Sequence, residues 1–135
     1  MGFRITGLPD APFAPLFDLS DAALAAQGAV RRIADGAYPC RISLTDSQPG
    51  DELLLLNYEH HAVASPYRMR FAIYVRRGET QYDAADEVPE QLRTRDLAVR
   101  AFDAEGMMVG RELTPGTSLE GSIARLFADS RAAYL

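Results

Sequence analysis

The chain has 135 residues, a formal net charge of −5 and 47% hydrophobic residues, a composition typical of a folded globular protein. This length fits one domain, so we expect residues 1–135 to form a single domain. The negative charge argues against nonspecific nucleic-acid binding, which depends on a basic face that neutralises phosphates. The most apolar stretch, Leu53 to Leu56, is too short to span a bilayer, so we expect no membrane partner.

The cysteine content and the N-terminus both point to a cytoplasmic protein. Cys40 is the only cysteine, so no disulfide can form within the chain. The first residues do not place a basic segment before an apolar one, as a secretory signal does. Met1 to Thr6 fit the loose pattern for N-myristoylation, but the same residues also predict a first strand, and we favour the strand.

The first third of the sequence predicts a strand, a connection, a helix and a second strand. Ser20 and Asp21 mark the helix start, because a hydroxyl can cap free backbone N–H groups and a carboxylate suits the positive end of a helix. Gly28 is expected to end this helix. The predicted segments are a strand at 3–5, a proline-rich connection at 7–15, a helix at 22–27 and a strand at 30–34.

Three further strands are predicted in the middle of the chain. Cys40, Ile42 and Leu44 would share one face of the first. Leu53 to Leu56 is apolar on both faces, as in a central strand, and should continue to a turn near residues 65–66. The clearest alternation runs from 67 to 76. Its inward face is predicted to consist of Tyr67, Met69, Phe71, Ile73 and Val75.

The last third predicts a long polar connection at 78–95, a hairpin and a helix. The hairpin turns at 103–106 between apolar strands. Thr117 and Glu120 are spaced as a capping box. The helix should bury a face made of Leu119, Ile123, Leu126 and Phe127.

These elements favour the α+β class. We expect a mainly antiparallel β-sheet of about five or six strands, with one N-terminal and one C-terminal helix. A closed or half-closed β-barrel is the alternative architecture.

Several short motifs are distributed over most of the chain: Tyr38-Pro39-Cys40-Arg41-Ile42-Ser43-Leu44, Pro49-Gly50-Asp51-Glu52, Leu54-Leu55-Leu56-Asn57-Tyr58, Ser65-Pro66-Tyr67-Arg68, Ile73-Tyr74-Val75-Arg76, Val99-Arg100-Ala101-Phe102-Asp103 and Leu126-Phe127-Ala128-Asp129. Together they resemble the bacterial domain-of-unknown-function family 1203. The resemblance implies a fold and a cytosolic setting, and it brings no activity. It also implies a further C-terminal strand with His, Asn and a Gly-Cys pair, whereas this chain stops at Leu135. The expectation is therefore either a short member or a truncated chain.

Cys40 with His60 or His61 is the one arrangement that could supply a nucleophile and a base. We expect Cys40 instead to be a small apolar core residue, because it shares a predicted face with apolar neighbours. Glu59, His60 and His61 could contribute two ligands to a metal ion, but no established metal-ligand spacing is present, so no metal site is predicted. No phosphate-binding glycine cluster occurs either, and no cofactor is expected.

Arg68, Arg70 and Arg76, with Tyr74, would form a stripe on the outward face of the predicted 67–76 strand. Guanidinium groups suit carboxylates and phosphates, so these are the candidate ligand-binding residues. The alternative is a solvated face that is paired with acidic residues across strands. The leading functional hypothesis is a non-catalytic binding or interaction domain for an anionic ligand or an acidic partner surface. The alternative is a small Cys/His-dependent enzyme. A homo-oligomer formed through an uncovered sheet edge is also possible.

Overall fold

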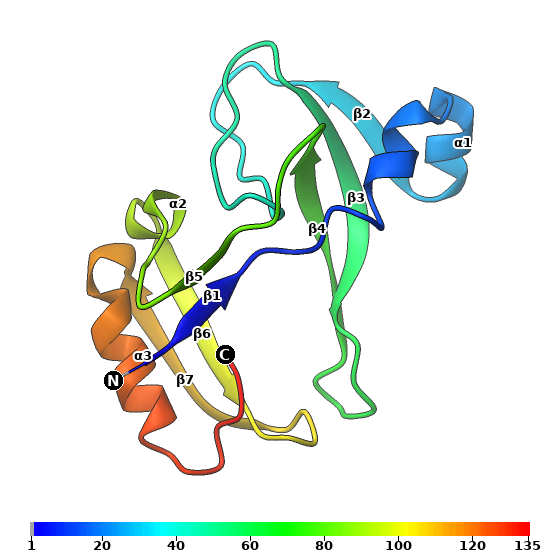
Figure 1. Ribbon diagram of the computed structural model, residues 1–135. Helices are drawn as coiled ribbons and strands as arrows, with labels where there is room; N and C mark the ends of the chain where they lie inside the picture. The colour runs from blue at the N-terminus through cyan, green and yellow to red at the C-terminus, as the bar shows by residue number, and fades with distance from the viewer. Residues whose placement is uncertain (1) are drawn as a thin grey trace. The chain divides into compact units, whose positions relative to one another are not determined.

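The computed structural model describes residues 2–135 of the chain, and within them it contains β-strands, α-helices and two short 3-10 helices. In chain order the elements are β1 (Arg4–Thr6), the 3-10 helix η1 (Ala14–Asp18), α1 (Asp21–Ala26), β2 (Ala29–Ile33), β3 (Glu52–His61), β4 (Met69–Arg76), β5 (Asp83–Ala85), α2 (Glu90–Arg93), β6 (Asp96–Phe102), β7 (Met108–Pro115), the 3-10 helix η2 (Gly116–Ser118) and α3 (Leu119–Phe127) (Figure 1).

The predicted α+β class is confirmed. The strands are divided among three small sheets, with the orders β1-β5, β2-β3-β4 and β6-β7. The β1-β5, β2-β3 and β6-β7 pairs are antiparallel. The sequence analysis predicted one larger sheet instead of three small ones. Local alternation identifies strands, but it does not identify the strands with which they pair.

The chain divides into two compact units. The β2–β3–β4 unit consists of Arg4–Tyr58 and Phe71–Ala85, and the β6–β7 unit consists of the N-terminus up to Phe3, Glu59–Arg70 and Asp86–Leu135. Strands β3 and β4 each contribute residues to both units. The expectation of a single domain stays a prediction.

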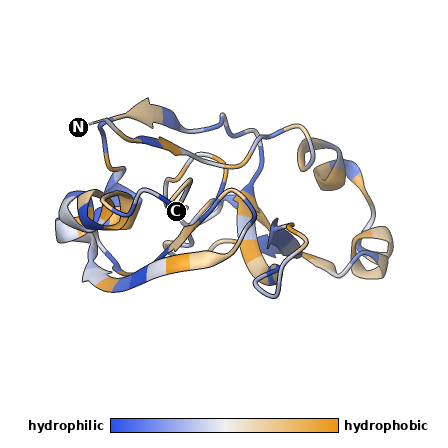
Figure 2. Cartoon of the chain, turned by 90° about the horizontal axis from the view of Figure 1, so that it is seen from below, coloured by the Kyte–Doolittle hydropathy of each residue, from blue (hydrophilic) through white to orange (hydrophobic). Residues whose placement is uncertain are grey.

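The core of the β2–β3–β4 unit lies around its central strand. β3 is central in the sheet order, and Leu53 and Leu54 are completely buried, as the apolar run predicted. Figure 2 colours the chain by hydropathy, and the strands carry hydrophobic stretches as well as hydrophilic ones. The main buried cluster consists of Phe13, Phe17, Leu24, Ala29, Cys40, Ile42, Leu54, Leu56, Ile73 and Val75.

Helix α1 begins where the sequence predicted. The Ser20 hydroxyl accepts a hydrogen bond from the backbone N–H of Ala23, at 3.1 Å, and Asp21 lies in the first turn. Gly28 follows the helix with a φ of 70°, a left-handed conformation that favours glycine. The chain then enters β2.

The predicted strand at 40–44 is wrong. Residues 41–43 form a turn, in which the N–H of Leu44 donates to the carbonyl of Cys40 at 3.2 Å. Leu44 has a φ of 52°, which is incompatible with a strand. Cys40, Ile42 and Leu44 are nevertheless buried, and Ser43 is buried with them, so the turn covers these apolar side chains without the alternating burial of a strand.

The inward face predicted for 67–76 is only partly correct. Ile73 and Val75 are buried as expected, but the Phe71 residue is 61% exposed. Tyr67 and Arg68 precede the strand, which begins at Met69. The connection at 78–95 also contains two unpredicted elements, β5 and α2.

In the β6–β7 unit, the hairpin and the C-terminal helix are confirmed. β6 and β7 pair through residues 96–115, and Leu119, Ile123 and Leu126 on α3 are buried. The predicted capping box is wrong, because Thr117 lies in η2 and the N-cap residue, Ser118, makes no side-chain cap. No helix among residues 2–135 is long and apolar enough to cross a membrane.

Candidate functional site

Arg68 and Arg70 lie in the β6–β7 unit, where both face the same carboxylate. Arg68 Nε donates to Glu59, and Arg70 Nη1 lies 3.8 Å from Glu59 Oε2. The Arg68 hydrogen bond lowers the pKa of Glu59 below its ordinary value. Both arginine side chains are more than half exposed, at 63% and 59%. Both arginines are thus paired with an acidic residue, which is the arrangement that the sequence analysis gave as the alternative to a ligand site.

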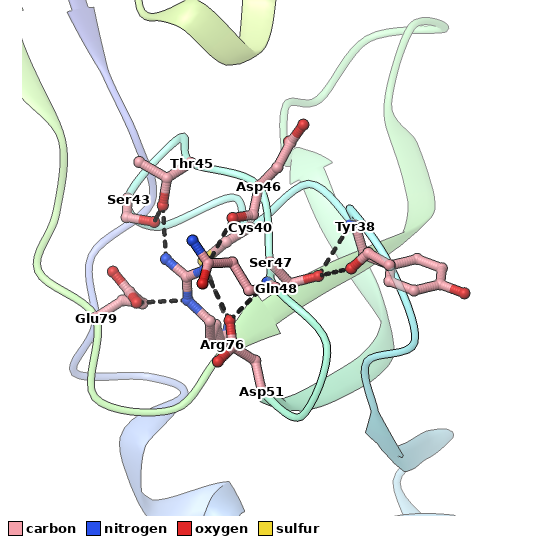
Figure 3. A network of polar contacts seen from close by, with 11 residues as sticks. Tyr38, Cys40, Ser43, Thr45, Asp46, Ser47, Gln48, Asp51, Arg76 and Glu79 are labelled. Atoms are coloured by element: carbon pink, nitrogen blue, oxygen red, sulfur yellow. Dashed lines mark hydrogen bonds and ion pairs between the residues drawn. The ribbon is translucent and has the colours of Figure 1, made fainter.

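Arg76 belongs to the other unit and is already bound to several oxygens (Figure 3). Its Nε lies 2.5 Å from Glu79, Nη1 lies 3.1 Å from Asp51, and Nη2 donates to the Thr45 hydroxyl at 2.7 Å. Nη1 also donates to the carbonyl of Asp46 at 3.0 Å. Burial lowers the pKa of Arg76, but the ion pairs with Glu79 and Asp51 raise it by more. Arg76 therefore stabilises the loop before β3, and a ligand would have to displace these contacts.

Cys40 is completely buried in the β2–β3–β4 unit. Its Sγ accepts a hydrogen bond from the backbone N–H of Arg76 at 3.4 Å. This is the environment of a core cysteine rather than of an accessible nucleophile, which must reach its substrate.

His60 and His61 lie in the β6–β7 unit, and His61 has both ring nitrogens engaged. Nδ1 lies 2.8 Å from the carbonyl oxygen of Tyr67 and therefore donates to it, and Nε2 forms a hydrogen bond of 2.8 Å with the Tyr134 hydroxyl. The ring also packs on Phe102, with centroids 4.0 Å apart. Both ring nitrogens of His61 are thus engaged in hydrogen bonds within the fold, and neither is free to bind a metal.

The Glu59-His60-His61 segment does not belong to a cluster of potential metal ligands within residues 2–135. Across residues 2–135, no group of three His, Cys, Asp or Glu side chains is placed to hold an ion. Glu59 is paired with arginine and His61 with Tyr67 and Tyr134.

Tyr74, the remaining predicted residue, lines a cavity of about 200 Å³ in the β2–β3–β4 unit. We call this the Arg32–Tyr74 cavity. The centroid of the Tyr74 ring lies 5.1 Å from that of the Tyr38 ring, and the Tyr38 hydroxyl donates a hydrogen bond to Asp35. That hydrogen bond raises the pKa of Tyr38 above its ordinary value. The lining consists of Arg32, Ile33, Ala34, Asp35, Tyr38, Leu53 and Tyr74.

Arg32 lines this cavity and forms no ion pair with a carboxylate of residues 2–135. Its neighbour Arg31 pairs with Asp21 and Glu52. Arg77 likewise pairs with Asp18 and with Glu52. An exposed guanidinium beside two tyrosines can hold a small anion with a flat or apolar body.

Sequence analysis did not identify Arg32. The doublet Arg31-Arg32 in a predicted strand was a usable signal, because adjacent strand residues point to opposite faces. Which of the two lacks an acidic partner depends on Glu52, twenty residues farther on, and on the turn that brings Tyr38 near Tyr74.

Comparison with known proteins identifies the family and nothing more specific. No curated protein and no solved structure matches this chain significantly. A family model described as "Protein of unknown function (DUF1203)" matches residues 37–135, which include Tyr38 and Tyr74 and leave Arg32 just outside. Because the match covers well over half of the sequence, the chain belongs to the DUF1203 family.

Proposed function

We propose that this protein is a non-catalytic domain that binds a small anionic ligand in the Arg32–Tyr74 cavity. The observation that carries the proposal is the position of Arg32, which lines the cavity and has no acidic partner in residues 2–135. A guanidinium binds carboxylate and phosphate groups through two parallel hydrogen bonds.

The rest of the cavity suits an apolar or aromatic ligand body. Tyr38 and Tyr74 supply ring surfaces, and Ile33 and Leu53 supply aliphatic surface. Asp35 is the one carboxylate on the lining, and it already accepts the Tyr38 hydroxyl. A volume of about 200 Å³ is below the range typical of drug-sized ligands, so a small ring carboxylate such as benzoate is a suitable probe.

The alternative, a Cys/His-dependent enzyme, has less support. It needs an accessible thiol and an imidazole nitrogen that can take a proton. Cys40 is completely buried, and the two ring nitrogens of His61 are both hydrogen bonded. We also infer a bacterial, cytoplasmic setting, which the lone cysteine and the family resemblance support.

The proposal is tested by isothermal titration calorimetry with sodium benzoate, and separately with inorganic phosphate. We expect wild-type protein to bind at least one probe and Arg32→Gln to lose most of that affinity. Loss of one charged, bidentate contact is expected to weaken binding by about tenfold or more. Tyr74→Leu should weaken binding of benzoate more than binding of phosphate, because only benzoate has a ring to pack.

Arg68→Gln/Arg70→Gln is the matched control. It removes exposed guanidinium groups from the stripe that the sequence favoured. Binding that disappears in this variant and survives in Arg32→Gln would assign the ligand to the stripe. If neither probe binds wild-type protein, the proposed function is wrong.

A further inference from the structure

The Arg32–Tyr74 cavity carries one charged group of each sign. Arg32 lies in β2, and Asp35 lies in the bend that follows this strand. Both residues are exposed, and both line the cavity. The lining therefore offers a ligand a cation and a carboxylate as separate contacts, with no net charge.

The two charged groups lie near the Tyr38 hydroxyl. The hydrogen bond from this hydroxyl to Asp35 raises the pKa of Tyr38, and the positive charge of Arg32 opposes the rise. A charge acts on a pKa in this way only from nearby. The backbone N–H of Tyr38 donates to Ser47 Oγ at 2.9 Å, and its ring points away from Arg76 (Figure 3). Both charges and the ring are thus within reach of one small ligand.

The Asp35 carboxylate can accept more than the Tyr38 hydroxyl. A carboxylate has about four positions at which it accepts hydrogen bonds, and Tyr38 occupies one of them at Oδ1. A ligand ammonium group can therefore bind Asp35 without displacing Tyr38.

A simple anion uses only part of this lining. An anion bound to Arg32 is repelled by the negative charge of Asp35 nearby. A zwitterion avoids this cost, because its carboxylate can bind Arg32 while its ammonium group binds Asp35. An α-amino acid carries both groups on one carbon atom, so both contacts are made by the same end of the molecule.

Apolar surface continues from the cavity along the sheet. Leu53 pairs with Arg32 in the register of β2 and β3, and on the same face of the sheet the next pair is Leu55 with Val30. Val30 is 45% exposed. Asp35 follows the end of β2, whereas Val30 precedes Arg32, so the charged groups lie at one end and the aliphatic surface at the other.

We propose that the ligand of the Arg32–Tyr74 cavity is a zwitterionic α-amino acid with an aromatic side chain. This inference rests on the proposed function and adds the class of ligand. The carboxylate binds Arg32, the ammonium group binds Asp35, and the side chain packs on the rings of Tyr38 and Tyr74. A volume of about 200 Å³ favours a single amino acid over a peptide.

The test is isothermal titration calorimetry of the full chain with three ligands that share one ring. L-phenylalanine carries both charges, 3-phenylpropionate lacks the ammonium group, and 2-phenylethylamine lacks the carboxylate. We expect wild-type protein to bind phenylalanine about tenfold more tightly than either of the others. This comparison does not depend on the folding of any variant.

Two variants assign the contacts. Asp35→Asn should weaken binding of phenylalanine by about tenfold and should not weaken binding of 3-phenylpropionate. Arg32→Gln should weaken binding of both. Glu105→Gln is the matched control, because it removes one negative charge from an exposed residue of the other unit, and it should bind phenylalanine like wild type. Circular dichroism checks that each variant is folded.

The outcomes separate this inference from the proposed function. Equal affinity of wild-type protein for phenylalanine and 3-phenylpropionate overturns the inference and leaves the anion site in place. A preference for phenylalanine that survives in Asp35→Asn does the same. Binding of 2-phenylethylamine as tight as that of phenylalanine overturns both, because the carboxylate then contributes nothing. If none of the three binds, the inference is wrong, and the titrations with benzoate and phosphate decide whether the proposed function is wrong with it.

Discussion

Replacing Arg76 with methionine should destabilise the fold more than removing any exposed arginine. The Arg76 side chain is 15% exposed, and its partners Glu79 and Asp51 are 23% and 35% exposed. Arg76→Met keeps an unbranched apolar stem and removes all of the hydrogen-bond donors of the side chain. The two carboxylates, the Thr45 hydroxyl and the Asp46 carbonyl then lose a partner in a partly dehydrated site.

The magnitude follows from the degree of burial. Removing one partner of a fully buried ion pair costs about 3–5 kcal/mol, whereas an exposed pair is worth about 0–1 kcal/mol. Arg76 lies nearer the buried limit, but Asp51 can still reach water. We therefore expect Arg76→Met to lower the free energy of unfolding by about 2–4 kcal/mol.

Urea unfolding followed by far-ultraviolet circular dichroism measures this loss. Arg68→Met is the control, because Arg68 is 63% exposed and pairs with one carboxylate, so it should lose no more than about 1 kcal/mol. Equal losses in the two variants would refute the reasoning, since burial would then not decide the strength of these contacts.

Three further predictions concern packing, pH and the thiol. Gly116→Ala should lower the free energy of unfolding by about 1–3 kcal/mol in urea melts, because its Cβ would lie 1.8 Å from a backbone oxygen of α2; Gly36→Ala, with open space around it, should change little. A hydrogen bond from Arg131 lowers the pKa of Asp129 from 3.8 to about 2. As the pH falls, the Asp129 carboxylate is therefore protonated in the unfolded chain before it is protonated in the folded protein. The stabilisation by this contact is complete above pH 3.8 and is lost as the pH falls toward 2. In thermal melts between these pH values, the melting temperature of Asp129→Asn should fall less steeply with pH than that of wild type. An equal slope in the two proteins would contradict this prediction. Iodoacetamide should modify Cys40 only after urea unfolding, and rapid reaction of the folded protein would revive the enzyme alternative.

The features that sequence analysis predicted correctly depend on neighbours along the chain. Ser20 caps a helix because its hydroxyl reaches an N–H three residues away. Leu53 and Leu54 predict a central strand because a run without polar residues has to be covered on both sides. The final helix and the hairpin before it follow from the same kind of local periodicity.

The features that it missed depend on contacts between distant segments. Phe71 lies on the same face of β4 as the buried residues Ile73 and Val75, and it is still exposed. The alternation of apolar residues predicts which face of a strand is apolar, but it does not predict how far along the strand other residues cover that face. β5 has only three residues and is held by pairing with β1, almost eighty positions earlier. Arg32 became a candidate only once the partners of Arg31 were known.

The most direct test of the central claim, an anion held by Arg32 beside two tyrosines, is a titration with benzoate followed by ¹H–¹⁵N correlation spectra. We expect saturable shifts that are concentrated at the amides of Arg32, Ala34, Tyr38 and Tyr74 and that are abolished by Arg32→Gln. Saturable shifts centred on Arg68 and Arg70, or no saturable shift at all, would contradict the account.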